Sequence, residues 1–345
     1  DGNNNNANVI SNANAIANAN AETRKRCVEQ LSSLWDSFLS NHEWLHPLVY
    51  DEVYGGIVSS QAFATKDPWS DFGNTVYNDH HYHYGYWLVA ASIFLYLRPD
   101  YPSRPELIRK IDTLVRDVAN PNPNDPWFPR FRNFDWYLGH SYSHGVTPFA
   151  DGKDQESVSE EINFHYGLRL WGMATGRDTV RDLGTLMLKI NARAARTYFL
   201  MDNSKTGGAG EREDSSSSLR VHPPEFLPNR VTGIYFDNKA DCTTWFSPER
   251  HCIHGIQMIP CSPATPLFRS LSFVRDEWES IVGKLPIITD PSKEQHQMPW
   301  QSLLFVNGAR IPHVRNEAME HLKTVPMDDG LSRAWALYMA ATTTD

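Results

Sequence analysis

The chain has 345 residues, of which 41% are hydrophobic and 21% charged, as in a soluble globular protein with one large or two ordinary domains. A formal net charge of −9 disfavours nucleic acid and anionic membrane surfaces as partners. No stretch approaches the roughly 20 apolar residues that a membrane span needs. A neutral polysaccharide remains compatible with all three observations.

Aromatic residues make up 12% of the chain, and many of them stand beside His, Asp or Asn rather than inside apolar runs. Flat aromatic faces flanked by polar groups suit sugar rings, which have apolar faces and polar rims. Packing in a hydrophobic core is the alternative explanation for each aromatic residue. The composition therefore admits a carbohydrate ligand without specifying one.

Four cysteines, Cys27, Cys242, Cys252 and Cys261, lack the CxxC spacing of a zinc site. The last three are close in sequence, so one disulfide and free thiols are both open. The N-terminus has neither the basic start nor the apolar run of a signal peptide.

Residues 1–20 read DGNNNNANVISNANAIANAN, which is too polar to build a packed core. We expect this tract to be disordered or to mark a boundary. A first helix is predicted over 21–40, where apolar residues from Cys27 to Phe38 fall on one stripe. Residues 41–78 are rich in loop signals.

Helical periodicity dominates the rest of the chain. Further helices are predicted over residues 82–97, 104–118, 155–175, 178–201, 269–283, 298–308, 312–323 and 330–342. Residues 203–220 read as a mobile surface loop, and 231–247 as short β segments. No βαβ rhythm occurs. The architecture that fits is mainly α, a helical (α/α) toroid or barrel that gathers long aromatic-rich loops around a cleft.

The segment NDHHYHYGYW, residues 78–87, concentrates ionisable and aromatic groups at one predicted helix start. Asp79 stands where an N-cap or first-turn residue would, and His83 follows four residues later on the same face. A capping aspartate beside a hydrogen-bonded histidine is the structural alternative. Asp79, His81 and His83 could also bind a metal ion, but no second cluster of His and Cys lies nearby.

The segment DGKDQESVSEEINFHYGLRLWG, residues 151–172, carries a second group of carboxylates. Glu156 and Glu160 are predicted four apart on one helix face, where like charges raise each other's pKa. That face continues to Phe164 rather than to Lys or Arg, which indicates that it points inward. Acid–base catalysis is a common reason for such carboxylates. An acidic first turn that complements the helix dipole is the alternative.

Other polar–aromatic clusters lie in FDWYLGHSYSHG, residues 134–145, and TTWFSPERHCIHGIQMIP, residues 243–260. Each cluster alone can also be explained by core packing. Together with the neighbours of Asp79 they give the candidate substrate-binding residues Tyr77, Tyr82, Asp135, Trp136, His140, His144, Trp245 and His254.

Four stretches in order, NDHHYHYGYW, FDWYLGHSYSHG, QESVSEEINFHYGLRLWG and HCIHGIQMIP, resemble glycoside hydrolase family 81, the endo-β-1,3-glucanases. The resemblance implies an (α/α)6 toroid over residues 21–345, complete or incomplete. It also implies a secreted or wall-associated monomer that acts on β-1,3-glucan without a cofactor or metal. Family members usually carry a β-sandwich ahead of the toroid. We therefore expect this chain to be a fragment, or its residues 1–20 to replace that part.

Carried over by position, the resemblance implies an inverting hydrolase with Asp79 as the general acid and Glu156 as the general base. Glu160 would be a second essential carboxylate, and His83 would lie in the cleft. Inversion requires the acid and the base on opposite faces of the sugar, roughly 6.5–9.5 Å apart. The candidate platforms for sugar stacking are Tyr82, Trp136 and Trp245.

Three alternatives remain at this point. A glucan-binding module that has lost catalysis would keep the aromatic residues but need not keep both carboxylates. A polysaccharide lyase on a helical toroid would act on an acidic substrate, which the net charge of −9 disfavours. A metal-dependent hydrolase would need the Asp79 cluster to hold an ion.

Overall fold

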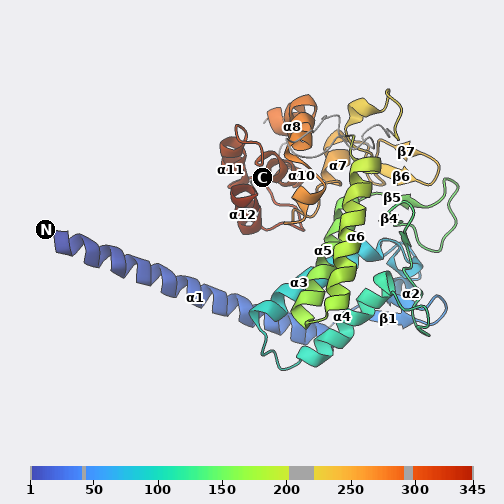
Figure 1. The fold of residues 1–345 in the computed structure, drawn as a ribbon, viewed down its shortest axis with the longest axis horizontal. Coiled ribbons are helices and arrows are strands. Elements are labelled where there is room, and N and C mark those ends of the chain that lie inside the picture. The colour runs from blue at the N-terminus through green and yellow to red at the C-terminus, as the bar shows by residue number, and fades with distance from the viewer. Residues whose placement is uncertain (1, 41–43, 202–220, 291–297, 344–345) are drawn as a thin grey trace.

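The computed structural model describes residues 2–40, 44–201, 221–290 and 298–343. The predicted surface loop at 203–220 lies outside these ranges. Within them the protein is mainly helical, and three small sheets lie to one side of the central helices (Figure 1). The prediction of a mainly α protein with a few short strands is confirmed.

Helices form the framework, and strands occur only in the connections. The helices are α1 (Gly2–Ser40), α2 (Gln61–Thr65), α3 (His80–Leu97), α4 (Arg104–Ala119), α5 (Val158–Thr175), α6 (Asp178–Ala194), α7 (Arg250–Gly255), α8 (Leu271–Ser280), α9 (Pro286–Thr289), α10 (Trp300–Gly308), α11 (Arg315–Leu322) and α12 (Arg333–Thr342). The strands are β1 (Leu48–Asp51), β2 (Gly56–Ser59), β3 (Phe134–Asp135), β4 (His140–Ser141), β5 (Asp154–Gln155), β6 (Ile234–Phe236) and β7 (Ala240–Asp241).

All strand pairs are antiparallel, and the sheet that contains β5 bears on function. β1 pairs with β2 and β3 with β4, each as a hairpin. β6 lies between β5 and β7, with Gln155 opposite Tyr235. The predicted β segments at 231–247 therefore form a hairpin beside the residues that lead into α5.

Two helical hairpins form the centre of the fold, and their first helices are parallel. Gly85 of α3 lies against Phe164 of α5, and Gly167 of α5 lies against Leu88, so both helices run the same way. A glycine at each contact allows the two backbones to approach closely. α6 returns antiparallel to α5 (Figure 1). The first residues of α3 and α5 consequently meet at the same end of the molecule.

Hydrophobic packing fixes α5 from two sides. One core cluster joins α1, α3, α4 and α5 and includes Trp35, Phe94 and Leu168. A second cluster joins the first turns of α5 to α6 and α8 and includes Ile162 and Phe273. Another cluster holds α10, α11 and α12 together. The start of α5 is therefore a rigid support for side chains that project from it.

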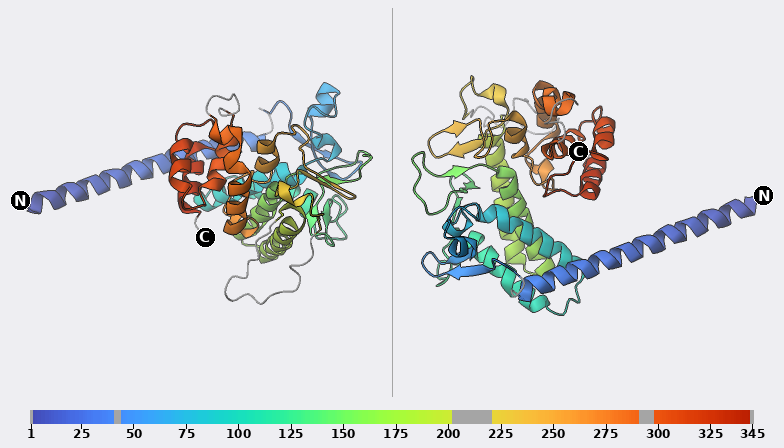
Figure 2. Two further views of the ribbon diagram at one scale, coloured as in Figure 1. Left: turned by 90° about the horizontal axis from the view of Figure 1, so that it is seen from above. Right: turned by 180° about the vertical axis from the view of Figure 1, so that it is seen from behind.

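Several boundaries differ from the predicted ones. α1 begins at Gly2 instead of about residue 21, and its first half projects from the body (Figures 1 and 2). Propagation from the stronger segment accounts for this extension, since Asn, the commonest residue of the tract, is itself a weak helix former. The loop-rich stretch 41–78 contains the β1–β2 hairpin and α2. The six-residue helix α7 was not predicted because it is too short for a periodic pattern. A domain boundary at residue 20 remains a prediction.

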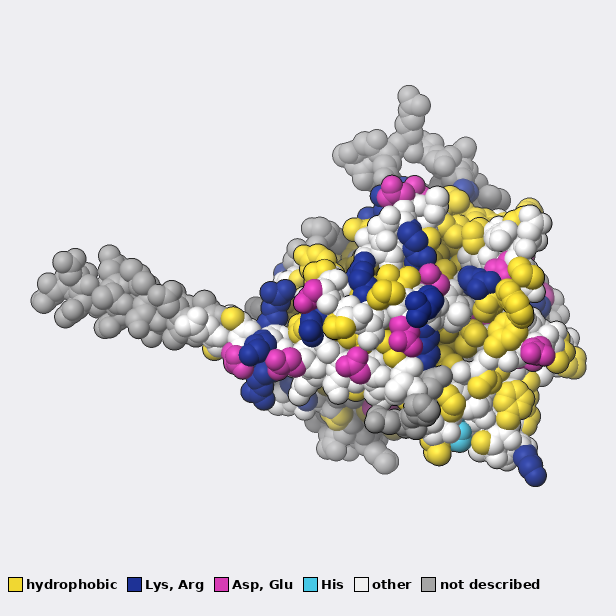
Figure 3. Space-filling view, turned by 90° about the horizontal axis from the view of Figure 1, so that it is seen from below, with side chains coloured by type: hydrophobic (Ala, Val, Ile, Leu, Met, Phe, Trp, Pro, Cys, Tyr) yellow, Lys and Arg dark blue, Asp and Glu magenta, His cyan; other side chains and the backbone are white. Residues whose placement is uncertain are grey.

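All four cysteines are free thiols, which decides between the two alternatives left by the sequence. In the described ranges no helix has the length and apolarity needed to cross a membrane. On the face seen in Figure 3, basic and acidic side chains are interspersed near the root of α1, and hydrophobic side chains are denser on the side away from it. That face carries no patch of a single charge sign.

Candidate active site

Asp79 is the N-cap residue of α3, directly before His80, and has an unusual backbone conformation. Its φ of 62° and that of Tyr77, 70°, are both left-handed, a conformation that Asp tolerates better than most residues. The Asp79 N–H donates to the Ser143 carbonyl at 2.9 Å, so the 140–146 segment holds the turn. The Asp79 side chain makes no capping hydrogen bond. The capping explanation is therefore wrong, and the carboxyl is free for another role.

Glu156 does not lie on α5, which corrects the prediction that it shares a helix face with Glu160. Ser157 is the N-cap of α5, and Glu156 lies between β5 and this cap, outside both elements. The Glu156 carboxylate accepts the main-chain N–H of Trp245 at 2.8 Å. Gln257 donates to the Glu156 carbonyl and accepts from Val158 N, so the turn after α7 fixes this segment.

Glu160 lies in the first turn of α5 and is directed toward α3. Ser157 Oγ accepts the Glu160 N–H at 3.4 Å, which is half of an S-x-x-E capping box. The other half is absent because the Ser157 N–H donates to the Tyr82 hydroxyl at 2.9 Å. The Glu160 carboxylate is thereby released from capping, and it accepts a 2.9 Å hydrogen bond from the Tyr86 hydroxyl.

The three carboxyls influence one another across the two helix starts. Burial, followed by the negative charges of Glu160, Glu156 and Asp154, raises the pKa of Asp79 well above its ordinary value. Burial also raises the pKa of Glu156 and that of Glu160 to about 7 each. The hydrogen bond from Trp245 N opposes the rise for Glu156. Burial and the neighbouring negative charges thus favour the protonated form of all three carboxyls.

A buried hydrogen-bond network lies beneath these carboxyls. The Tyr82 hydroxyl donates to Gln155 Oε1 at 2.8 Å and accepts the N–H groups of Glu156 and Ser157. Gln155 Nε2 in turn donates to Glu161 Oε2 at 2.8 Å. The Tyr82 side chain is only 5% exposed. It ties α3 to the Glu156 segment, and this burial corrects the prediction that its ring stacks on sugar.

Glu161 is the buried anion of this network. Its carboxylate accepts from Ser141 N, Gln155 Nε2, Asn191 Nδ2 and His165 Nε2. Hydrogen bonding and the charge of His165 outweigh burial, so the pKa of Glu161 is lowered to about 2. A single ionised side chain thus connects β4, β5, α5 and α6.

We expect the Glu161→Ala variant to lose about 3–5 kcal/mol of folding free energy, because several buried donors lose their acceptor together. Denaturant unfolding of the variant beside wild type measures this loss. The matched control is Glu279→Ala, at an exposed position of α8. A loss for Glu161→Ala no larger than that of the control contradicts the structural role.

Two of the predicted binding residues lie beside the carboxyls. Trp245 is 52% exposed, and its indole N–H donates to Asp154 Oδ2 at 3.0 Å. His144 Nδ1 lies 3.2 Å from Asp154 Oδ1. The exposed ring of Phe149 packs edge-on against Trp245 and tilts over His144. These residues form an aromatic margin next to Glu156.

Other predicted binding residues are placed elsewhere. Tyr77, His140 and His254 are at most 2% exposed, so they support the fold instead of offering a surface to a ligand. Asp135 caps a turn by accepting the N–H groups of Tyr137 and Leu138. Trp136 is 41% exposed but packs on Phe131 and Phe134, and no described contact links it to the carboxyls.

His83 lies one turn after Asp79 without a side-chain hydrogen bond to it among the described contacts. Burial lowers the pKa of His83 to about 4, so the ring is neutral at physiological pH. His81 points into the network, where Nε2 lies 3.2 Å from Gln155 Oε1. In the described ranges no three His, Cys, Asp or Glu side chains form a group that could hold a metal ion.

Three nearby residues were missed in the sequence. Asp154 is two positions before Glu156, and alternation along a strand puts both on one side, a signal available from the DQE triplet. Tyr86 is seven residues after Asp79, two helical turns along the same face. Asp328 lies between α11 and α12, 168 positions after Glu160 in the sequence (328 − 160 = 168). Its negative charge raises the pKa of Glu160, and no local sequence pattern predicts that the two residues are close.

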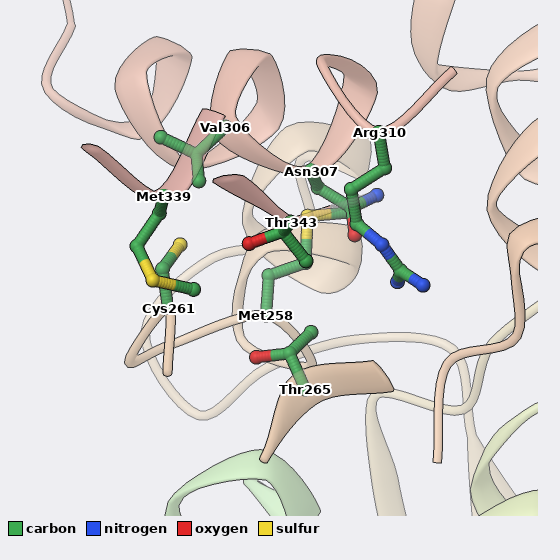
Figure 4. Close-up of a pocket in the computed structure, with 8 residues that line it drawn as sticks. All are labelled: Met258, Cys261, Thr265, Val306, Asn307, Arg310, Met339 and Thr343. Atoms are coloured by element: carbon green, nitrogen blue, oxygen red, sulfur yellow. The ribbon is translucent and has the colours of Figure 1, made fainter. Parts of the chain in front are cut away.

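A groove of about 900 Å³ begins at Tyr86 and separates α3 and α5 from residues 260–263 and α12. Its walls are mainly apolar. A smaller hollow between the turn after α7 and the α10–α12 cluster is lined by Met258, Cys261, Thr265, Val306, Asn307, Arg310, Met339 and Thr343 (Figure 4). None of the carboxyls described above lines either cavity, and Tyr86, which donates to Glu160, connects the groove to the site.

We expect Glu160→Gln to stabilise the protein above pH 7 and not below the ordinary pKa of 4.5. The pKa of Glu160 is about 7 in the folded state and 4.5 in the unfolded state. Ionisation therefore destabilises the folded state once the pH exceeds 4.5, and this destabilisation reaches its full size above pH 7. Gln removes that penalty and keeps an acceptor for Tyr86. The expected gain is about 1–2 kcal/mol after solvent screening. Equal unfolding free energies for variant and wild type at both pH extremes, with Glu279→Gln as control, would contradict it.

Comparison with known proteins gives a consistent result. Residues 3–337 match the family model described as the glycosyl hydrolase family 81 C-terminal domain. The primary septum glucan endo-1,3-beta-D-glucosidase of Schizosaccharomyces pombe is 36% identical over 320 residues, which cover 92% of this chain and 29% of that protein. A glucan endo-1,3-beta-D-glucosidase of Arthroderma benhamiae is 38% identical over 317 residues, 90% of this chain and 33% of that protein.

A solved structure also resembles the chain. A mutant of a family 81 glycoside hydrolase from Clostridium thermocellum superposes with a TM-score of 0.69 and 26% sequence identity, over 85% of this chain and 37% of the other. The chain thus spans well under half the length of each of these proteins.

Proposed function

Because the chain belongs to glycoside hydrolase family 81, we propose that it hydrolyses internal β-1,3-glucosidic bonds of β-glucan with inversion at the anomeric carbon. One observation carries the proposal: Asp79 and Glu156 stand at the starts of two parallel helices, interact electrostatically, and both have a pKa raised by burial. Glycoside hydrolysis uses such a pair of carboxyl groups, one as acid and the other as base. The names of the relatives support β-1,3-glucan as the substrate.

In this mechanism protonated Asp79 donates its proton to the glycosidic oxygen as the bond to the anomeric carbon breaks. Ionised Glu156 accepts a proton from the water that attacks that carbon from the opposite face. The products are a new reducing end of inverted configuration and an alcohol, with one water consumed. Glu160, held by Tyr86, orients the water or the base. His83 and the exposed Trp245 ring contact the sugar.

The wider proposals follow the family. We propose an (α/α)6 toroid, supported by the parallel α3 and α5 and by α6, which is antiparallel to α5. We also propose a monomer that binds neither nucleic acid nor membrane, needs no cofactor, and acts outside the cell or at the cell wall.

The test of substrate and chemistry is reducing-sugar release from linear β-1,3-glucan, with β-1,4-glucan as control. NMR of the first products distinguishes the anomers, and we expect the α anomer. Release of the β anomer, or cleavage of both polymers, contradicts the proposal. A glucan-binding module is the second candidate, favoured by the aromatic margin beside Glu156. Oligosaccharide binding without cleavage would select it.

We expect kcat/KM to follow a bell-shaped pH profile. Activity rises as Glu156 loses its proton near its pKa of about 7 and falls at higher pH as Asp79 loses its own. Because Glu156 and Glu160 interact, the acidic limb reports the pair. Initial rates at low substrate concentration measure the profile. An acidic limb at the ordinary value of a glutamate, 4.5, would contradict the role of burial.

A further inference from the structure

Trp245 bonds to two carboxylates at once. Its main-chain N–H donates to Glu156 Oε1 at 2.8 Å, and its indole N–H donates to Asp154 Oδ2 at 3.0 Å. Asp154 is 2% exposed, whereas Trp245 is 52% exposed and lies in the loop between β7 and α7. The buried carboxylate therefore anchors a surface residue whose backbone in turn holds the proposed base.

Asp154 is also connected to the proposed acid. Ser143 donates its N–H to the Asp154 carbonyl at 2.7 Å and its hydroxyl to Asp154 Oδ2 at 3.2 Å. The Ser143 carbonyl then accepts the Asp79 N–H at 2.9 Å. Hydrogen bonds thus run without a break from the backbone of Asp79 through Asp154 to the carboxylate of Glu156.

We propose that Asp154 is a positioning residue that fixes the base through Trp245 and the acid through Ser143, and thereby sets the distance between the two. The inference rests on the proposed function, since it assigns Asp154 to the same hydrolytic site. Nothing requires Asp154 to touch the substrate.

The charge of Asp154 distinguishes this role from plain support of the fold. An uncharged Asn could accept the indole N–H without the desolvation that burial imposes on a carboxylate. Asp154 instead faces His144, and its negative charge raises the pKa of Glu156 while the Trp245 bond lowers it. The other titratable groups that face Asp154 and Glu156 are Asp79, Glu160 and the Tyr82 phenol.

These opposed effects give a test that a structural role would not pass. Trp245→Phe keeps the flat ring and the backbone N–H but loses the indole anchor, so Glu156 is held less firmly and the acidic limb moves to higher pH. Asp154→Asn keeps an acceptor but removes the charge, so the limb moves to lower pH. We expect shifts of about half a pH unit in opposite directions and roughly tenfold lower kcat for Trp245→Phe.

Trp127→Phe is the matched control, because Trp127 is 58% exposed and packs on Tyr50, away from the carboxyls. We expect this variant to keep the pH profile of wild type. A readout independent of activity is the NMR signal of the Trp245 indole N–H, identified by its absence in Trp245→Phe. In wild type its shift should follow a carboxyl titration that vanishes in Asp154→Asn.

The outcomes separate the two hypotheses. If wild type cleaves glucan and Glu156→Gln does not, the proposed function stands. Unchanged profiles in both variants, or shifts of the same sign, then overturn the inference about Asp154 alone. If wild type cleaves nothing, the indole titration still decides whether Asp154 anchors Trp245, and its absence overturns the inference.

Discussion

Glu156→Gln is expected to lower kcat for β-1,3-glucan by roughly 10²–10⁴-fold while KM changes little, because Gln cannot take a proton from the attacking water. The amide oxygen can still accept the Trp245 N–H, so the local fold should persist. Steady-state kinetics on linear glucan give both constants. Glu279→Gln, at an exposed position of α8, controls for the loss of a carboxylate elsewhere.

A second variant tests the identity of the lost step. Glu156→Ala leaves space where the base stood, so a small anion such as azide can attack the anomeric carbon directly without a base. We expect azide to restore part of the activity and to yield the α-glycosyl azide. A Glu156→Gln variant that retains wild-type kcat, or an azide product of β configuration, contradicts the assignment of Glu156 as the base.

Much of the site could be predicted because its carboxyls lie in segments with strong local signals. The apolar spacing of α3 located the helix start at which Asp79 stands. Glu156 was placed on the wrong element because its segment was read with the helical period. Reading Ser157 as the cap of α5 and the preceding DQE as strand would have separated Glu156 from Glu160.

The sequence predicts which residue types stand near the site better than it predicts which of their side chains are buried. Tyr82 and Trp245 are both aromatic residues beside polar ones, yet one is 5% and the other 52% exposed. The difference arises when Gly85 lets α3 pack against Phe164, which directs Tyr82 inward. Such a contact joins segments about 80 residues apart, so no local pattern carries it.

Asp79→Asn is expected to abolish only the part of catalysis that depends on protonating the leaving group. Asn tolerates the left-handed backbone at this position, so the turn should be kept. On natural β-1,3-glucan the leaving group is a poor one and requires a proton, so kcat should fall by roughly 10²–10⁴-fold. On a β-laminaribioside of dinitrophenol, whose leaving group needs no proton, the loss should be small. Asp182→Asn, an exposed residue of α6, is the control.

The pH profile of Asp79→Asn provides the second half of this argument. The alkaline limb should disappear, since it reports the proton of Asp79. The acidic limb should keep its position, because Asp79 as the general acid is already protonated and uncharged at the pH where Glu156 ionises. Equal losses on both substrates would instead mean that Asp79 acts by binding or positioning. The combination of a leaving-group effect and a lost alkaline limb is specific to a general acid, because neither binding nor folding depends on the basicity of the departing oxygen.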